Sequence, residues 1–81
     1  MKLFNFSVIE GRLRNDPIMH DDKCIMYIKN DEIVFRIQTS GTIADVCMKH
    51  LKNNSRVLCS GKMDGGDTMI AKEINFLQDK E

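Results

Sequence analysis

The sequence predicts an all-β domain with one helix, in which five short strands roll into a small, partly open barrel. Its 81 residues are enough for one hydrophobic core and too few for two, so residues 1–81 are expected to form a single domain. Most of the chain consists of short, strand-like segments separated by turn residues. One segment, residues 42–52, has the period of an amphipathic helix instead.

The first strand is expected over residues 3–13, LFNFSVIEGRL, where Gly11 predicts a bulge or a sharp bend. Phe4 and Phe6 share one side of this strand. Its edge is a candidate surface for pairing with a second copy of the chain, although both rings could instead fill the core. The polar stretch that follows, residues 14–23, contains the only proline, Pro17, and predicts a loop.

Residues 24–38, CIMYIKNDEIVFRIQ, are typical of a hairpin. A two-residue turn at Asn30 and Asp31 would place Tyr27 opposite Val34. The period of two then gives one apolar face and one mixed face, and a slip of one residue would mix them. The apolar face comprises Cys24, Met26, Ile28, Ile33, Phe35 and Ile37; the other comprises Ile25, Tyr27, Lys29, Glu32, Val34, Arg36 and Gln38.

The helix is expected to begin at Thr42 as N-cap, with Asp45 in the capping-box position, and to end at Asn53 and Asn54. His50 is interpreted as a packing residue with one satisfied ring nitrogen, rather than as a catalytic base. The apolar stripe would consist of Ile43, Val46, Cys47, His50 and Leu51.

Two further strands are expected at residues 56–63, RVLCSGKM, and 68–78, TMIAKEINFLQ, joined by a turn at DGGD, residues 64–67. The order is therefore strand–strand–strand–helix–strand–strand. This order fits the five-stranded OB-fold barrel. In that fold the helix covers one end of the barrel, which explains why a short isolated helix is stable here.

The charge of the chain excludes a general attraction to anions, since 12 basic residues balance 12 acidic ones. Any anion-binding surface must be a local patch. No apolar run is long enough to span a bilayer, and the N-terminus does not have the pattern of a signal peptide, so a cytoplasmic location is expected.

Catalytic and metal-binding patterns do not stand out. Cys24, Cys47 and Cys59 lack C-x-x-C spacing and are expected to be buried, reduced thiols rather than zinc ligands. There is no Ser/His/Asp set, and the glycines of DGGD are not followed by the Lys-Ser/Thr of a phosphate-binding loop. The sequence therefore predicts a non-enzymatic protein without metal or cofactor.

Three stretches resemble the bacterial single-stranded DNA-binding protein family, and together they cover nearly the whole chain. VIEGRLRNDP, residues 8–17, is similar to the first strand and following turn of that family. FRIQTSGTIADVCMKHLKNNSRVLCSGKM, residues 35–63, is similar to its third strand, helix and fourth strand. MIAKEINFLQ, residues 69–78, is similar to its last barrel strand. The resemblance implies an OB-fold that binds single-stranded DNA in replication, recombination or repair.

The chain also departs from that family. The long hairpin between the second and third strands shrinks to KNDE, and there is no tryptophan to stack on bases. Val34 and Ser40 stand where the family has stacking aromatic residues, and the chain ends at Glu81 without the family's acidic tail. These features indicate a minimal or divergent member, closer in size to the small dimeric primosomal relatives.

An OB-fold binds single strands on the face of its second and third strands, between the flanking loops. On this chain, Tyr27 is the candidate for stacking on a base, and Arg36 for contacting phosphate or stacking beside a base. The other candidates for the DNA-binding face are Lys29, Arg12, Arg14 and Lys62, which would neutralise phosphates. Tyr27 could instead be an amphipathic residue half-covered by a neighbour or a partner subunit, and the basic residues could form an ordinary solvated face.

One stacked base contributes about 1–3 kcal/mol, whereas micromolar affinity requires about 8 kcal/mol. A homodimer or homotetramer that presents several faces to one strand is therefore expected. Acidic residues in both flanking loops would repel phosphate if they faced the groove; they are Asp16, Asp21, Asp22, Asp64 and Asp67. Two alternatives remain open: an OB module that binds proteins rather than nucleic acid, and a module that binds single-stranded RNA.

Overall fold

The computed structural model describes residues 6–78, which form six strands and one helix. The helix lies between the fourth and fifth strands. The sequence prediction places it between the third and fourth of five strands, and the short second strand, which was not predicted, accounts for the difference. In chain order the elements are β1 (Ser7–Leu13), β2 (Ile18–His20), β3 (Lys23–Asn30), β4 (Ile33–Ser40), α1 (Gly41–His50), β5 (Arg56–Met63) and β6 (Thr68–Leu77).

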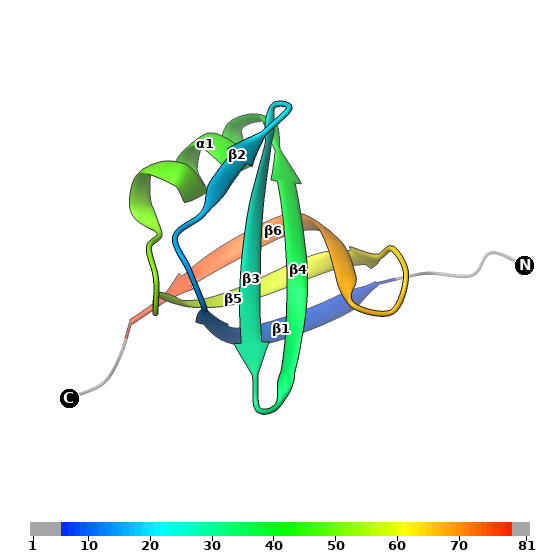
Figure 1. Cartoon of the computed structure of the whole chain (residues 1–81). Coiled ribbons are helices and arrows are strands. Elements are labelled where there is room, and N and C mark those ends of the chain that lie inside the picture. Colours follow the sequence, from blue (N-terminus) through cyan, green and yellow to red (C-terminus); the bar gives the residue numbers. More distant parts are fainter. Residues whose placement is uncertain (1–5, 79–81) are drawn as a thin grey trace, which may run out of the picture.

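Five of the strands close into a mixed barrel. β1 pairs with β5, β5 with β6, β6 with β4, β4 with β3, and β3 returns to β1. The β4–β6 pairing is parallel and the others are antiparallel. The β3–β4 hairpin crosses in front of β1, β5 and β6, and α1 lies at one end of the barrel (Figure 1). The predicted five-stranded OB-like architecture is confirmed.

Gly11 lies where β1 passes from β5 to β3. The β1–β5 register is regular through Gly11, so of the two predicted alternatives, a bulge or a sharp bend, the bulge is wrong. A Cβ at this position would collide with the carbonyl oxygen of Lys29 and lie 2.7 Å from Cγ2 of Ile28. The glycine is therefore needed because two backbones approach closely. The irregularity of the barrel lies instead in the β5–β6 pairing, between Ser60 and Gly61.

The β3–β4 hairpin turns one residue later than predicted, at Asp31 and Glu32, with Asp31 in a left-handed conformation (φ 54°). Tyr27 consequently lies opposite Arg36 rather than Val34. Every residue of β3 thus lies opposite the β4 residue two positions beyond the predicted one. An even displacement keeps the alternation of side chains, so the face assignment holds. Two residues depart from the burial pattern. Ile33, on the apolar face, follows the turn directly and is 57% exposed, whereas Ile25, on the mixed face opposite Ile18 of the short strand Ile18–His20, is buried.

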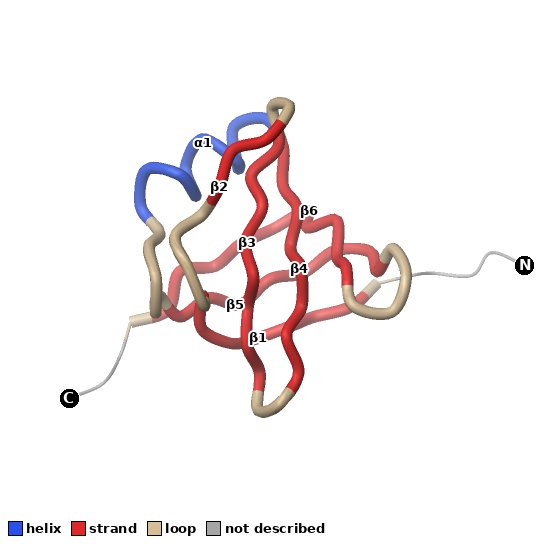
Figure 2. Tube along the Cα trace, in the orientation of Figure 1, coloured by secondary structure: helices blue, strands red, loops and turns tan. Residues whose placement is uncertain are grey.

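β2 is the element that the sequence analysis missed. Its three residues pair with the start of β3, and Ile18 lies opposite Ile25. The connecting turn is made by Asp21 and Asp22, which both have positive φ angles (49° and 64°). β2 thus forms a short hairpin with β3 inside the stretch predicted to be a loop (Figure 2).

The helix begins earlier than predicted. Ser40 is its N-cap, in an extended conformation and without a side-chain cap bond, so the Thr42 cap is wrong. The left-handed Gly41 (φ 65°) makes the turn into the helix. At the other end, the helix stops at His50 with Leu51 as C-cap, before the predicted end at Asn53 and Asn54. Of these two residues, only Asn54, in the loop after the helix, has the expected left-handed conformation (φ 75°).

The buried face of α1 is rotated from the predicted stripe. Ala44 and Cys47 are the buried helical residues, whereas Val46 and His50 are exposed. The predicted stripe and the observed buried face both satisfy the helical period, and only the docking of the helix on the barrel selects between them. The His50 ring instead lies 6.2 Å from the ring of Phe76, centroid to centroid, near the surface.

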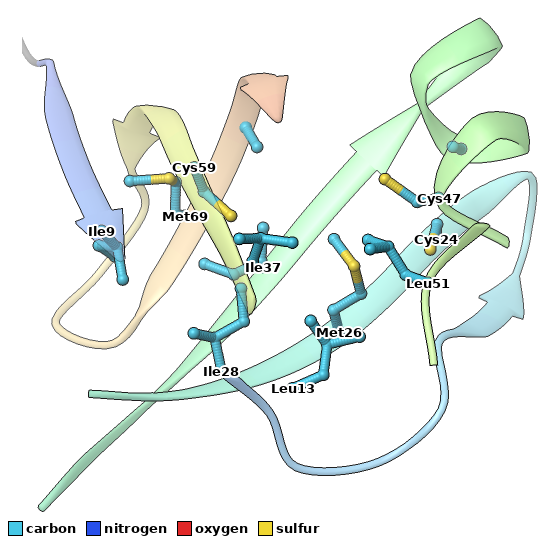
Figure 3. Packing of buried hydrophobic residues seen from close by; sticks show 13 residues of the cluster. Ile9, Leu13, Cys24, Met26, Ile28, Ile37, Cys47, Leu51, Cys59 and Met69 are labelled. Carbon is cyan, nitrogen blue, oxygen red and sulfur yellow. The ribbon is translucent and has the colours of Figure 1, made fainter. Parts of the chain in front are cut away.

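The core is one cluster that joins the barrel interior to α1. Cys47 and Leu51 lie beside Cys24 and Met26 at the end of the barrel that the helix covers (Figure 3). All three cysteines are fully buried and free, as predicted. Fully burying one large apolar side chain contributes roughly 1.5–3 kcal/mol, so this contact anchors the helix.

Candidate nucleic-acid interface

Five of the six candidate residues meet on the outer surface of β1, β3 and β4. The backbone N–H of Arg14 donates to the carbonyl oxygen of Tyr27 (2.8 Å), and Tyr27 lies opposite Arg36. These three residues form one row across the sheet. In the next row, Arg12 lies opposite Lys29. Side chains alternate between the two faces along a strand. The residues between these positions are Leu13 on β1 and Ile28 on β3, and both are buried. The candidate side chains therefore point outward.

Tyr27 has open space beside it. It is half-buried and lines a hollow of about 330 Å³ with Arg14, Asn15 and Val34, which we call the aromatic hollow. An aromatic ring fixed on a strand and open to solvent can stack on a base of any kind, since every base has a π-face.

The cations of this surface are only partly neutralised. Within residues 6–78, the ion pairs join His20 to Asp21 and Arg56 to Glu10, and the side chains of Arg14, Lys29 and Arg36 have no acidic partner. The protein therefore has a local basic patch although its net charge is zero. Such a patch can attract phosphates where the whole molecule cannot.

The acidic loop residues are distributed unevenly around this patch. Asp16 accepts a hydrogen bond from the backbone N–H of Asn53 (2.8 Å), so its carboxylate is held by the loop after α1. Asp67 lies next to Arg36, because the backbone N–H of Arg36 donates to the carbonyl oxygen of Asp67 (2.8 Å). Asp67 therefore remains a source of repulsion beside Arg36.

Lys62 is not brought next to the other five residues. It lies on β5 opposite Ile70 of β6, and Ile70 lies opposite Gln38 of β4. In this direction, β6 separates Lys62 from β4. In the other direction β1 lies between β5 and β3, and Lys62 adjoins the Ser7 end of β1, whereas β3 pairs with the opposite end, at Arg12 and Leu13. Of the two candidate interface residues, Phe6 is 66% exposed, and Phe4 is outside the described residues.

A second and larger hollow, of about 590 Å³, lies beside the first and shares Arg14 with it. We call it the basic hollow. Its walls come from β1, the β3–β4 turn, the α1–β5 loop and the start of β5. It is lined by Glu10, Gly11, Arg12, Leu13, Arg14, Lys29, Asn30, Asp31, Asn53, Asn54 and Arg56.

Sequence reasoning missed the basic hollow because its walls are far apart along the chain. Arg12 donates from Nη1 to the carbonyl oxygen of Asn54 (3.1 Å), 42 residues away. Asn30 donates from Nδ2 to the carbonyl oxygen of Glu10 (2.5 Å), 20 residues away. No local spacing signals such contacts, and Asn30, Asn53, Asn54 and Arg56 therefore were not candidates.

The buried cysteines are not suited to chemistry. Burial, and secondarily the neighbouring Cys47, raises the pKa of Cys59 to about 12, so its thiol stays protonated at neutral pH. Burial likewise raises the pKa of Cys47 to about 11. Among residues 6–78, no group of three His, Cys, Asp or Glu side chains is placed to hold a metal ion. In the same part of the chain, no helix has the length and hydropathy needed to cross a membrane.

No protein-family model and no curated protein matches the sequence. The fold does match solved structures, including the crystal structure of a small single-stranded DNA-binding protein from Streptomyces coelicolor. That match has a TM-score of 0.77 and 11% sequence identity, and it covers 93% of this chain and 94% of the other. The chain thus shares the OB-like barrel of a small single-stranded DNA-binding protein over almost its entire length.

Proposed function

We propose that the protein binds single-stranded DNA, without sequence preference, on the outer surface of β3 and β4. The observation that carries this proposal is the half-buried Tyr27 beside three cations, Arg14, Lys29 and Arg36, that have no acidic partner among residues 6–78. An aromatic platform with nearby cations is the combination by which OB-folds hold single strands. The fold similarity to a single-stranded DNA-binding protein supports the same reading.

The interactions suggest distinct roles for these residues. Tyr27 stacks on a base, and Arg36, directly opposite it, contacts the phosphate or stacks beside the base. Lys29 and Arg14 neutralise the phosphates that follow, whereas the Arg12 guanidinium already donates to the carbonyl oxygen of Asn54. Such contacts do not read base edges, so binding is independent of sequence. Single strands of this kind arise in DNA replication, recombination and repair, which are the processes that we propose for the protein.

A single subunit is expected to bind weakly, because one stacked base contributes about 1–3 kcal/mol and micromolar affinity requires about 8 kcal/mol. We therefore propose that two or four subunits act together on one strand. The start of β1 is the proposed contact surface, because Phe6 and Val8 are 66% and 56% exposed there. Solution mass measured by light scattering tests this, and a monomer at all concentrations would exclude it.

The proposed function is tested by titrating labelled oligothymidylate with the protein at low salt. Tyr27→Ala is expected to weaken binding by about 1–3 kcal/mol, or roughly 5- to 150-fold, since it removes the stacked base contact. Lys49→Ala is the matched control, because Lys49 is an exposed cation in the last turn of α1. Equal affinities for the two variants, or no binding by the wild-type protein at tens of micromolar concentration, would refute the proposal.

The same titration separates the alternatives. Competition with RNA of the same sequence tells whether DNA or RNA is preferred, because stacking serves both polymers. Complete absence of binding to either polymer would favour the protein-binding OB module. An apolar groove of about 200 Å³ between α1 and β6, with Ile43, Val46 and Ile74 in its lining, would then be the surface to examine.

A further inference from the structure

We infer that the strand leaves Tyr27 over Arg14 and places its next phosphodiester in the basic hollow, towards the Asn53–Asn54 loop. The inference rests on the proposed function and specifies the direction of the bound strand. The opposite direction would lead across β6 towards Lys62. The difference matters because the two paths use different cations.

The position of Arg14 connects the two hollows. Arg14 lines both of them and is hydrogen-bonded through its backbone to Tyr27. A base stacked on Tyr27 therefore has Arg14 between itself and the basic hollow. No comparable link exists in the other direction among the described residues, because β6 separates β4 from Lys62.

The charge of the basic hollow favours a phosphate. Its lining contains four cationic side chains and two acidic ones, Glu10 and Asp31. Glu10 is already neutralised by Arg56, which donates to one of its carboxylate oxygens from Nη2 (2.7 Å) and from Nε (3.1 Å). Arg14 and Lys29 then remain without an acidic partner among residues 6–78.

The walls of the basic hollow are also held in place. The backbone N–H of Leu13 donates to the carbonyl oxygen of Ser55 (2.9 Å), and the N–H of Asn54 donates to the carbonyl oxygen of Leu13 (2.8 Å). These bonds tie β1 to the loop after α1, and the Asn30 amide ties the β3–β4 turn to β1. A hollow held by bonds from several elements loses little conformational entropy when it binds a ligand.

The test uses two aspartates at opposite ends of β3, Asp31 and Asp22. Both are exposed turn residues with positive φ, which asparagine tolerates, so Asp31→Asn and Asp22→Asn are equivalent changes in charge and conformation. Only Asp31 lines the basic hollow. The two residues flank eight strand residues and are therefore roughly 25–30 Å apart, several screening lengths at physiological salt.

Affinity for labelled oligothymidylate is measured for both variants at low and at physiological salt. At low salt, Asp31→Asn is expected to tighten binding about threefold, as removal of one charge roughly 7 Å from a phosphate would do in water. Asp22→Asn is expected to change the affinity by less than about 1.5-fold at low salt, because a charge roughly 25–30 Å away contributes little in water even without screening. Lys29→Gln should weaken binding by a similar factor. Since the aspartate variant gains affinity, its effect cannot be mistaken for misfolding.

The outcomes distinguish this inference from the proposed function. No binding by the wild-type protein would sink both. A second outcome is that Tyr27→Ala weakens binding while neither Asp31→Asn nor Asp22→Asn changes it. That result would overturn the path through the basic hollow and leave the proposed function standing. A loss on Lys62→Gln together with no loss on Lys29→Gln would mean that the strand leaves across β6.

Discussion

Replacing Arg36 by alanine should lower both the affinity for single-stranded DNA and its dependence on salt. Three cations of the interface, Arg14, Lys29 and Arg36, lack acidic partners in residues 6–78 and are each expected to neutralise one phosphate. For single strands the logarithm of affinity falls with the logarithm of salt concentration by about 0.7 per phosphate contact, which predicts a slope of about −2.1. Removing one contact should change the slope to about −1.4.

These slopes give measurable differences. Between about 50 and 200 mM salt, the wild-type affinity should fall about 18-fold and the Arg36→Ala affinity about sevenfold. The assay is fluorescence anisotropy of a labelled oligothymidylate at four or more salt concentrations. Urea unfolding of the variant serves as the control, because Arg36 is half-buried and its backbone is bonded to Asp67. An unchanged slope in a folded variant would refute the reasoning, since the phosphates would then lie elsewhere.

Other predictions concern the barrel itself. Gly11→Ala should lower the free energy of unfolding by about 1–3 kcal/mol, because the added Cβ would collide with the Lys29 carbonyl oxygen. Gly66→Ala is the control and should lower it by only about 0.5 kcal/mol or less, because the space around Gly66 is open. Equal urea midpoints for the two variants would contradict this. Ile37→Ala, fully buried, should cost about 2–5 kcal/mol, and a cost below 1 kcal/mol would mean that the core is not packed as described. The raised pKa of Cys59 predicts a contribution to the free energy of unfolding that is constant below about pH 9 and falls between about pH 9 and 12, because the thiol of the unfolded chain ionises first. Cys59→Ala should flatten this part of the pH profile of stability. An unchanged profile would contradict the burial of the thiol.

Much of the fold could be predicted because it depends on periodicity. In the β3–β4 hairpin the predicted register was displaced by two residues, yet Cys24, Met26 and Ile28 still fell on the interior face, since an even displacement keeps the alternation. β2 could not be predicted in the same way, since its three residues are too few to show a period. Its turn residues, Asp21 and Asp22, resemble those of any polar loop.

The candidate site could be predicted only where it lies on neighbouring strands. Tyr27 and Arg36 follow from one hairpin, because the face assignment places both outside. Lys62 was predicted from its residue type and strand, but strand order separates it from the others. The basic hollow depends on contacts such as Arg12 with Asn54, which only the closed barrel brings together.

The orientation of α1 shows the same limit. The helical period allowed either Val46 and His50 or Ala44 on the buried side. Docking on the barrel end selected Ala44, which is 1% exposed, while Val46 is 38% exposed. A small side chain permits close approach of the helix to the sheet, and no property of the helix alone specifies which side that is.

The most direct test of nucleic-acid binding at this surface is the intrinsic fluorescence of the protein during a titration with oligothymidylate. The chain has one tyrosine and no tryptophan, so the signal comes from Tyr27 alone. Saturable quenching that is reversed by added salt is expected, with free tyrosine as the control for light absorbed by the DNA. Binding of a labelled strand that leaves the Tyr27 emission unchanged would contradict stacking on this residue, and would place single-stranded DNA on another part of the molecule.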